Sequence, residues 1–246
     1  MCMRIQSVQN YYAKPAFTSW KRDVLNKDNE IVNRNDTMLY RGDLDWNSFV
    51  KFANKKYRDV DKVNVYDYAC SDGSEAYTFL ISMFNNIPIK DTKKFLPVLA
   101  YDIDNNAIKK AKSGELSISE EEKLRFAINS NYDLETFFDK NRYFNLYFPK
   151  TILSKNVEFD VADIQKHYKK IKPDNTIVIA RNFWPYLPYS ARFKLAENLY
   201  DKLGENSMVV IGNYDATPHF EYDYGVGVIL AKAGFKKSII DNVYEK

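Results

Sequence analysis

Acidic and basic side chains follow several short apolar runs of this chain, at the points where the runs end. The runs are rich in β-branched and aromatic residues, and the polar segments after them are Cys70–Glu75, Asp102, Asp163 and Arg181–Tyr186. Carboxylates bind cationic groups and accept hydrogen bonds from hydroxyls. If the runs are strands of one parallel sheet, these segments meet in a crevice beyond its carboxyl edge. The pattern therefore predicts a ligand site rich in carboxylates.

The loop Cys70-Ser71-Asp72-Gly73-Ser74-Glu75 distinguishes between two kinds of adenine-containing ligand. A dinucleotide site uses G-x-G-x-x-G, so that backbone amides can approach a pyrophosphate. This loop has one glycine, Gly73, and two acids, Asp72 and Glu75, which are poor neighbours for a phosphate. S-adenosylmethionine carries a sulfonium, an ammonium and a ribose diol, and it has no phosphate. The loop therefore favours S-adenosylmethionine over NAD.

Asp102 and Asp163 each allow two interpretations. Asp102 ends the second expected strand, where an acid can accept both ribose hydroxyls. In Asp102-Ile103-Asp104 an acid can also cap the following helix, so one of the two acids can cap while the other binds. Asp163 has the same ambiguity, because it can bond the adenine amino group or end a turn.

The segment Arg181-Asn182-Phe183-Trp184-Pro185-Tyr186 marks the exit of a buried strand into the crevice. A plain turn with a packed Trp184 would explain it equally well if it stood alone. Together with the acidic loops, we expect it to form a wall of a methyl-transfer site, where aromatic faces can also meet a sulfonium.

Hydrophobic periodicity predicts alternating helices and strands from Trp46 onward. The expected helices are Trp46–Tyr57, Glu75–Phe84, Asn105–Lys112, Ser119–Ala127, Tyr189–Leu203 and Val226–Ala233. The expected strands are Val63–Ala69, Phe95–Tyr101, Val157–Phe159, Thr176–Ala180, Met208–Gly212 and Lys236–Val243, with a hairpin of Tyr143–Phe148 and Thr151–Ser154. This alternation predicts an α/β fold, a Rossmann-like doubly wound, mostly parallel sheet.

The domain organisation follows from where the periodicity begins. Residues 1–46 are polar and weakly periodic, and we expect an N-terminal extension that covers the cofactor site and contributes little to the core. Residues 47–246 form the Rossmann-like domain, and 115–155 is a candidate insertion.

The composition narrows the function further. Lys and Arg number 36 against 33 Asp and Glu, an excess too small for a nucleic-acid footprint. With two His and two Cys, we expect no metal site and no disulfide framework. No run approaches the ~20 apolar residues of a membrane span, so we expect a cytoplasmic protein.

Five blocks, in order, resemble the CheR-type methyltransferases, which methylate glutamate side chains of chemotaxis receptors. They are Asn35-Asp36-Thr37-Met38-Leu39-Tyr40-Arg41 (family N-x-T-x-F-F-R), Cys70–Tyr77 (C-S-x-G-E-E-P-Y), Ala100–Asp104 with Ala111–Gly114 (A-x-D-I-D, A-R-x-G), Phe159–Ile164 (F-x-x-x-N-L) and Arg181-Asn182 with Tyr186 (R-N-x-x-x-Y). Ser74, Ala76 and Asp163 depart from the family pattern, and only 34 residues precede Asn35, where the family usually has a helical domain.

The resemblance implies a role for each matching residue. Asn35, Thr37 and Arg41 would reach over the cofactor, with Arg41 beside the reacting methyl. Gly73 and Glu75 would hold the methionine end, Asp102 the ribose, and Asp163 and Ile164 the adenine. The residues left for the cofactor and acceptor walls are Arg181, Asn182 and Tyr186.

We therefore expect a methyltransferase that converts S-adenosylmethionine to S-adenosylhomocysteine, and the resemblance implies a protein carboxylate as acceptor. Such an acceptor is already ionised at neutral pH and needs no strong base. A methyltransferase acting on a small molecule or nucleic acid, and a degenerate cofactor-binding interaction module, remain the alternatives.

Overall fold

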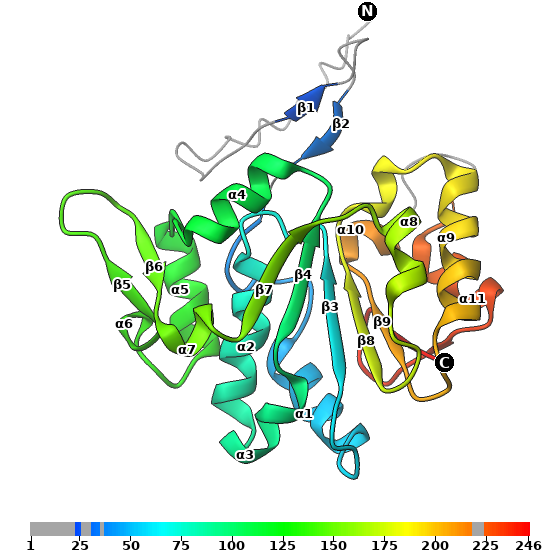
Figure 1. Cartoon of the computed structure of the whole chain (residues 1–246), viewed down its shortest axis with the longest axis horizontal. Helices are drawn as coiled ribbons and strands as arrows, with labels where there is room; N and C mark the ends of the chain where they lie inside the picture. The colour runs from blue at the N-terminus through cyan, green and yellow to red at the C-terminus, as the bar shows by residue number, and fades with distance from the viewer. Residues whose placement is uncertain (1–22, 26–30, 35–36, 218–223) are drawn as a thin grey trace, which may run out of the picture.

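The computed structural model describes residues 23–25, 31–34, 37–217 and 224–246. The main sheet has the strand order β10-β11-β9-β8-β3-β4-β7 (Figure 1). Its parallel strands are β3 (Asn64–Tyr68), β4 (Val98–Asp102), β7 (Val157–Val161), β8 (Thr176–Ala180) and β9 (Met208–Val210). The chain runs outward from β3 to β7 and then returns to β8. The strand order thus reverses between β3 and β8, where doubly wound sheets bind ligands.

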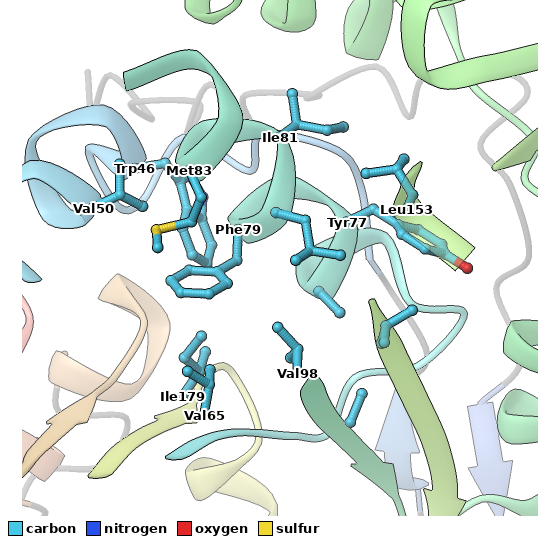
Figure 2. Close-up of a cluster of buried hydrophobic side chains, with 14 of the residues drawn as sticks. Trp46, Val50, Val65, Tyr77, Phe79, Ile81, Met83, Val98, Leu153 and Ile179 are labelled. Atoms are coloured by element: carbon cyan, nitrogen blue, oxygen red, sulfur yellow. The ribbon is translucent and has the colours of Figure 1, made fainter. Parts of the chain in front are cut away.

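Helices cover both faces of this sheet. The helices α1 (Trp46–Lys56), α2 (Ser74–Asn86) and α4 (Asn105–Ser113) lie on one face, and α8 (Ile164–His167), α9 (Tyr189–Lys202) and α11 (Val226–Ala233) lie on the other (Figure 1). In β3, Val65 faces the first core and Tyr66 and Tyr68 face the second. Figure 2 shows the first core, where Trp46 and Phe79 pack over Val65 and Ile179. The predicted doubly wound α/β fold is confirmed.

Local sequence signals set the helix boundaries. The Asp45 side chain accepts a hydrogen bond from the Ser48 amide (3.0 Å) and starts α1. Asp104 accepts from the Asn106 amide (2.8 Å) and starts α4. Gly114 ends α4 at φ 72°, a left-handed conformation that costs glycine little. Short helical segments follow some of the strands and turns: α3 (Ile89–Thr92), η1 (Lys93–Phe95), η2 (Tyr168–Lys170), η3 (Trp184–Tyr186) and α10 (Asn213–Ala216).

Residues 115–155 differ from the expected hairpin. They form α5 (Glu120–Asn129), α6 (Leu134–Phe137), β5 (Phe138–Lys140), β6 (Tyr147–Pro149) and α7 (Thr151–Ser154). The pairing of Tyr143–Phe148 with Thr151–Ser154 is wrong, because β6 pairs with β5 and Thr151–Ser154 is helical. The Asn141 side chain accepts from the Tyr143 amide (2.9 Å) and turns the hairpin there. The apolar Leu153 is fully buried from its helical turn.

Two other expectations need correction. Lys236–Val243 is two antiparallel strands, β10 (Lys236–Lys237) and β11 (Val243–Glu245), because Asn242 adopts φ 63° and reverses the chain. The segment before α1 is not outside the core, since Leu39, Tyr40 and Leu44 are buried in it. Earlier in the chain, β1 (Asp23–Leu25) and β2 (Ile31–Arg34) form an antiparallel pair that we did not predict.

None of the helices within the described residues is long and apolar enough to cross a membrane.

Candidate active site

A pocket of about 110 Å³ lies at the carboxyl ends of β3, β4 and β8. It brings together four of the predicted site residues, Asp102, Asp163, Ile164 and Tyr186. Its other walls include Tyr68, Ile103, Phe183 and Leu187, so the lining is largely apolar. A flat aromatic base fits such a lining, and the two acids are polar groups at its edge.

Asp102 is held rigidly at the end of β4. The residue is 2% exposed, and its two carboxylate oxygens accept from the backbone amides of Ser71 (2.9 Å) and Asp104 (2.8 Å). Burial raises the pKa of Asp102, and these amide hydrogen bonds oppose the rise. Each oxygen keeps a lone pair for a further donor. The capping half of the predicted division of labour is confirmed, because Asp104 caps α4, and the binding of a ligand by Asp102 stays a prediction.

Asp163 caps a helix as well as lining the pocket. Its side chain accepts from the Gln165 amide (2.9 Å) at the start of α8. Ile164, the next residue, is buried among the apolar residues of the second core. The helix cap fixes both residues at the rim, where they can face a base.

A second group of site residues forms an ionic cluster around Arg181. The guanidinium makes ion pairs with the carboxylates of Asp43 and Glu75. The side-chain amide of Asn182 donates to the Asp43 carboxylate (3.1 Å). The Arg181 guanidinium lies 4.9 Å from the ring centre of Trp46. We call Asp43, Glu75, Arg181 and Asn182 the Arg181 cluster. Its arginine side chain has no exposed surface, whereas the side chains of Asp43 and Glu75 are 13% and 12% exposed.

A third carboxyl group lies beneath this cluster. Asp67 of β3 is fully buried, and neither of its oxygens receives a hydrogen bond from a donor group. Burial and the neighbouring Glu75 carboxyl raise the pKa of Asp67 well above its usual range. Burial also raises the pKa of Glu75, which the charges of Arg181 and Arg41 oppose. Burial and the closeness of the two carboxyl groups therefore disfavour the ionisation of Asp67.

The segment after β8 owes its shape to a few fixed contacts. Asn182 has φ 61°, which is unusual for a residue other than glycine. Trp184 is fully buried, and its indole N–H donates to the Ala180 carbonyl (2.8 Å). Tyr186 turns toward the pocket, with its ring 6.3 Å from that of Tyr214. Trp184 packs as a plain turn would require, and its neighbours Phe183 and Tyr186 line the pocket.

The predicted covering segment is described from Thr37 onward, and Asn35 lies outside the described residues. Backbone amides anchor it, because Leu39 donates to Glu122 of α5 (3.0 Å) and Tyr40 donates to Thr78 of α2 (3.0 Å). Arg41 lies near enough to Glu75 for its charge to lower the pKa of that carboxyl. Thr37 is half-buried, and no contact places it at the pocket.

Gly73, another predicted site residue, is required by the backbone. It has φ 91°, and a Cβ there would lie 2.6 Å from the ring of Phe159. Close packing thus explains this glycine, and its contact with the cofactor stays a prediction.

Sequence reasoning missed Asp43, Asp67 and Asp215, although each left a signal. Asp43 lies two residues after Arg41, and Asp67 is the one charged residue of the apolar run Val63–Ala69. Asp215 follows the strand β9, as Asp102 and Asp163 follow or end their own strands. For Asp67 and Asp215, a charged residue inside or shortly after a buried strand was the signal of a site residue.

The fold and the site together define a class. A doubly wound sheet has at its switch point two acids beside an apolar pocket, and the loop after β3 has one glycine in place of a phosphate-binding set. This combination is that of S-adenosylmethionine-dependent methyltransferases.

Comparison with known families identifies the family within this class. Residues 35–226 match the model of the CheR methyltransferase, SAM binding domain. The chain belongs to the CheR methyltransferase family, and it is a methyltransferase whose cofactor is S-adenosylmethionine.

Several solved structures are similar to the chain. A TehB-like SAM-dependent methyltransferase from Corynebacterium glutamicum is 14% identical, covers 82% of this chain and 87% of its own, and gives a TM-score of 0.43. An O-methyltransferase family protein from Burkholderia thailandensis is 9% identical, with coverages of 81% and 55% and a TM-score of 0.43. PKMT2 from Rickettsia typhi in complex with AdoHcy is 13% identical, with coverages of 61% and 21% and a TM-score of 0.35.

Proposed function

We propose that the protein transfers the methyl group of S-adenosylmethionine to a carboxylate side chain of a protein, as in glutamate O-methylation. The match to the CheR domain over residues 35–226 is the observation that carries this proposal. A carboxylate oxygen attacks the methyl carbon while the bond from that carbon to sulfur breaks. The products are a methyl ester and neutral S-adenosylhomocysteine, and no proton has to be removed.

The acids of the site fit a reaction without a general base. Asp102 accepts two backbone amides, Glu75 pairs with Arg181, and Asp67 is fully buried. Each of these acids is buried or already holds a structural contact, and an acceptor that is already ionised needs none of them as a base. Catalysis by alignment of the carboxylate with the sulfonium suits this arrangement.

We assign the cofactor contacts on the same basis. Asp102 would accept the ribose hydroxyls, and Asp163 with Ile164 would border the adenine. Glu75 would meet the methionine ammonium, with Gly73 in the loop before it. Arg181, Asn182 and Tyr186 would form the walls toward the acceptor, and Asn35, Thr37 and Arg41 would cover the reacting methyl.

The chemistry of the transferred label tests the acceptor class. Purified protein is incubated with cell lysate and methyl-labelled cofactor, and labelled protein is separated and treated with mild base. Methyl esters release methanol under these conditions, whereas methylated amines keep the label. We expect base-labile label on protein, suppressed by excess S-adenosylhomocysteine. Base-stable label, or label on nucleic acid or small molecules, would overturn the carboxylate proposal.

A further inference from the structure

A buried carboxylate outside the predicted site holds the backbone of the segment after β8. Asp215, on the short helix α10, is 1% exposed. One of its oxygens accepts from the amides of Asn182 (2.5 Å) and Gly212 (2.8 Å), and the other accepts from the amide of Trp184 (3.2 Å). Three backbone donors from two loops thus converge on one side chain.

These hydrogen bonds tie together the loops that follow β8 and β9. The loops approach so closely that a Cβ on Gly212 would lie 2.2 Å from the Asn182 side-chain oxygen. The amide of Asn182 points at Asp215 in the left-handed conformation of that residue, at φ 61°. A backbone held in this conformation needs contacts that fix it, and Asp215 supplies them.

The tied segment contains residues of the Arg181 cluster. Arg181 precedes the bonded amide of Asn182, and its side chain reaches Asp43 and Glu75. Asn182 is held at both ends, by Asp215 at its backbone and by Asp43 at its side chain (3.1 Å). Phe183 and Tyr186, on either side of the bonded amide of Trp184, line the pocket.

We propose that Asp215 is a positioning residue of the methyltransferase: by holding the amides of Asn182 and Trp184, it fixes the direction in which Arg181, Asn182 and Tyr186 face the cofactor. This inference rests on the binding of S-adenosylmethionine and is independent of the acceptor. The Asp215 carboxyl group does not line the pocket, and it contacts the Arg181 cluster only through the backbone amide of Asn182.

The charge of Asp215 gives the proposal a pH signature. Burial raises the pKa of Asp215 to about 7, and the three amides and the charge of Arg181 oppose the rise. Other titratable groups on the elements that pack against α10 are Tyr214 on α10 itself, Tyr186 on η3 and Lys232 on α11. The ionised carboxylate can accept all three amides, whereas the protonated form turns one oxygen into a donor. The loop is therefore held best above about pH 7.

Affinity and stability then depend on pH in opposite directions. The folded-state pKa of Asp215 lies above the ordinary value of 3.8, so its contribution to stability is full below the unfolded pKa and is lost as the pH rises through about 7. Cofactor affinity instead rises through the same range, because the ionised form positions the loop. A residue that only stabilised the fold would make affinity follow stability.

The test compares Asp215→Asn with a matched control variant at the amino ends of the parallel strands, away from the candidate site. Ser207 is fully buried, and its hydroxyl accepts the Thr176 amide (3.2 Å) where β8 begins. Binding of S-adenosylhomocysteine is measured by calorimetry between about pH 6 and pH 8, with thermal melting of each variant. For Asp215→Asn we expect about ten-fold weaker binding at the upper pH and loss of the pH dependence. Ser207→Ala should melt lower and bind within about two-fold of the unmodified chain.

Several results would overturn the proposal. Asp215→Asn could bind as tightly as the unmodified chain, or Ser207→Ala could lose as much affinity. If Asp215→Asn does not fold, the unmodified chain decides, because pH-independent affinity across this range contradicts the role of the charge. A chain that binds no S-adenosylhomocysteine at any pH would instead overturn the cofactor assignment, which separates the two failures.

Discussion

The pocket beside Asp102 and the Arg181 cluster lie at the same edge of the sheet and are held in different ways. The pocket is open space of about 110 Å³ whose acids are fixed by backbone amides, Asp102 by those of Ser71 and Asp104 and Asp163 by that of Gln165. The cluster is held by ion pairs, and its charged side chains come from segments far apart in the chain. We call the pocket the nucleoside half and the Arg181 cluster the methionine half, after the parts of the cofactor that we propose they bind. Backbone hydrogen bonds hold the acids of the nucleoside half, whereas the methionine half depends on ion pairs between segments far apart in the chain.

This difference has a consequence for cofactor binding. The side chains of Asp43 and Glu75 are 13% and 12% exposed, so their charges are already largely removed from water. A methionine ammonium that binds Glu75 as we propose would compete with Arg181 for this carboxylate, which is already paired and mostly buried. We expect binding at this half to be an exchange of ion pairs, with a smaller net gain than the number of contacts suggests.

Removal of Arg181 breaks the comparison most severely. Arg181→Ala leaves Asp43 and Glu75 without their common partner, above the already buried Asp67. We expect the free energy of unfolding to fall by about 3–5 kcal/mol, the usual cost of removing one partner of a buried pair. Urea unfolding of the variant measures this. Lys237→Ala, which removes an exposed ion pair with Asp241, is the control and should unfold like the unmodified chain.

Replacement of Asp102 and Asp104, one at a time, by alanine tests the nucleoside half of the site. Asp102→Ala should weaken binding of S-adenosylhomocysteine by about 1–3 kcal/mol, because charge-assisted hydrogen bonds to a buried partner are lost. Asp104→Ala should leave binding nearly unchanged and lower stability by about 1 kcal/mol through loss of the α4 cap. Side-by-side calorimetric titration and thermal melting give both numbers. The reverse ranking would mean that the acids have the opposite roles.

Substitution of Arg41 tests a residue whose charge acts on Glu75 of the methionine half. The amides of Leu39 and Tyr40 anchor its segment, so Arg41→Ala should keep the fold and change the melting temperature little. If Arg41 covers the reacting methyl as we propose, its guanidinium acts chiefly in the transition state, so we expect cofactor affinity to fall modestly and turnover to fall about ten-fold or more. Steady-state kinetics with the labelled acceptor measure this.

Lysine at the same position is the matched variant. Arg41→Lys should restore little turnover, since a point charge does not replace a planar two-pronged donor. An Arg41→Ala variant as active as the unmodified chain would remove Arg41 from the site.

The pocket beside Asp102 was the part of the candidate site that could be predicted from the sequence. The runs that end at Ala69, Tyr101 and Ala180 have strand composition, and parallel strands bring their carboxyl ends to one edge. Asp102, Asp163, Ile164 and Tyr186 therefore meet in one pocket as expected. The pattern of these residues is local, and a local pattern is what a single sequence shows.

The Arg181 cluster could not be predicted in the same way. Its ion pairs join Arg181 to Glu75 and Asp43, and no periodicity links residues so far apart. Asp43 lies in a polar segment that we expected to contribute little to the core, whereas Leu44 and Trp46 near it are buried. The predicted pairing within residues 115–155 was wrong for a related reason. An aromatic-rich connector such as Tyr143–Phe148 has strand composition whichever segment it pairs with.

The separation of the Arg181 partners in the chain also bears on folding kinetics. The ion pairs to Glu75 and Asp43 close loops of 106 and 138 residues. Contacts across such loops form only after the intervening strands and helices are organised, because loop closure must be offset first. The cluster is then absent from the transition state for folding. The stability that it contributes would appear in the rate of unfolding, so the same ion pairs that shape the methionine half would also set the lifetime of the folded chain.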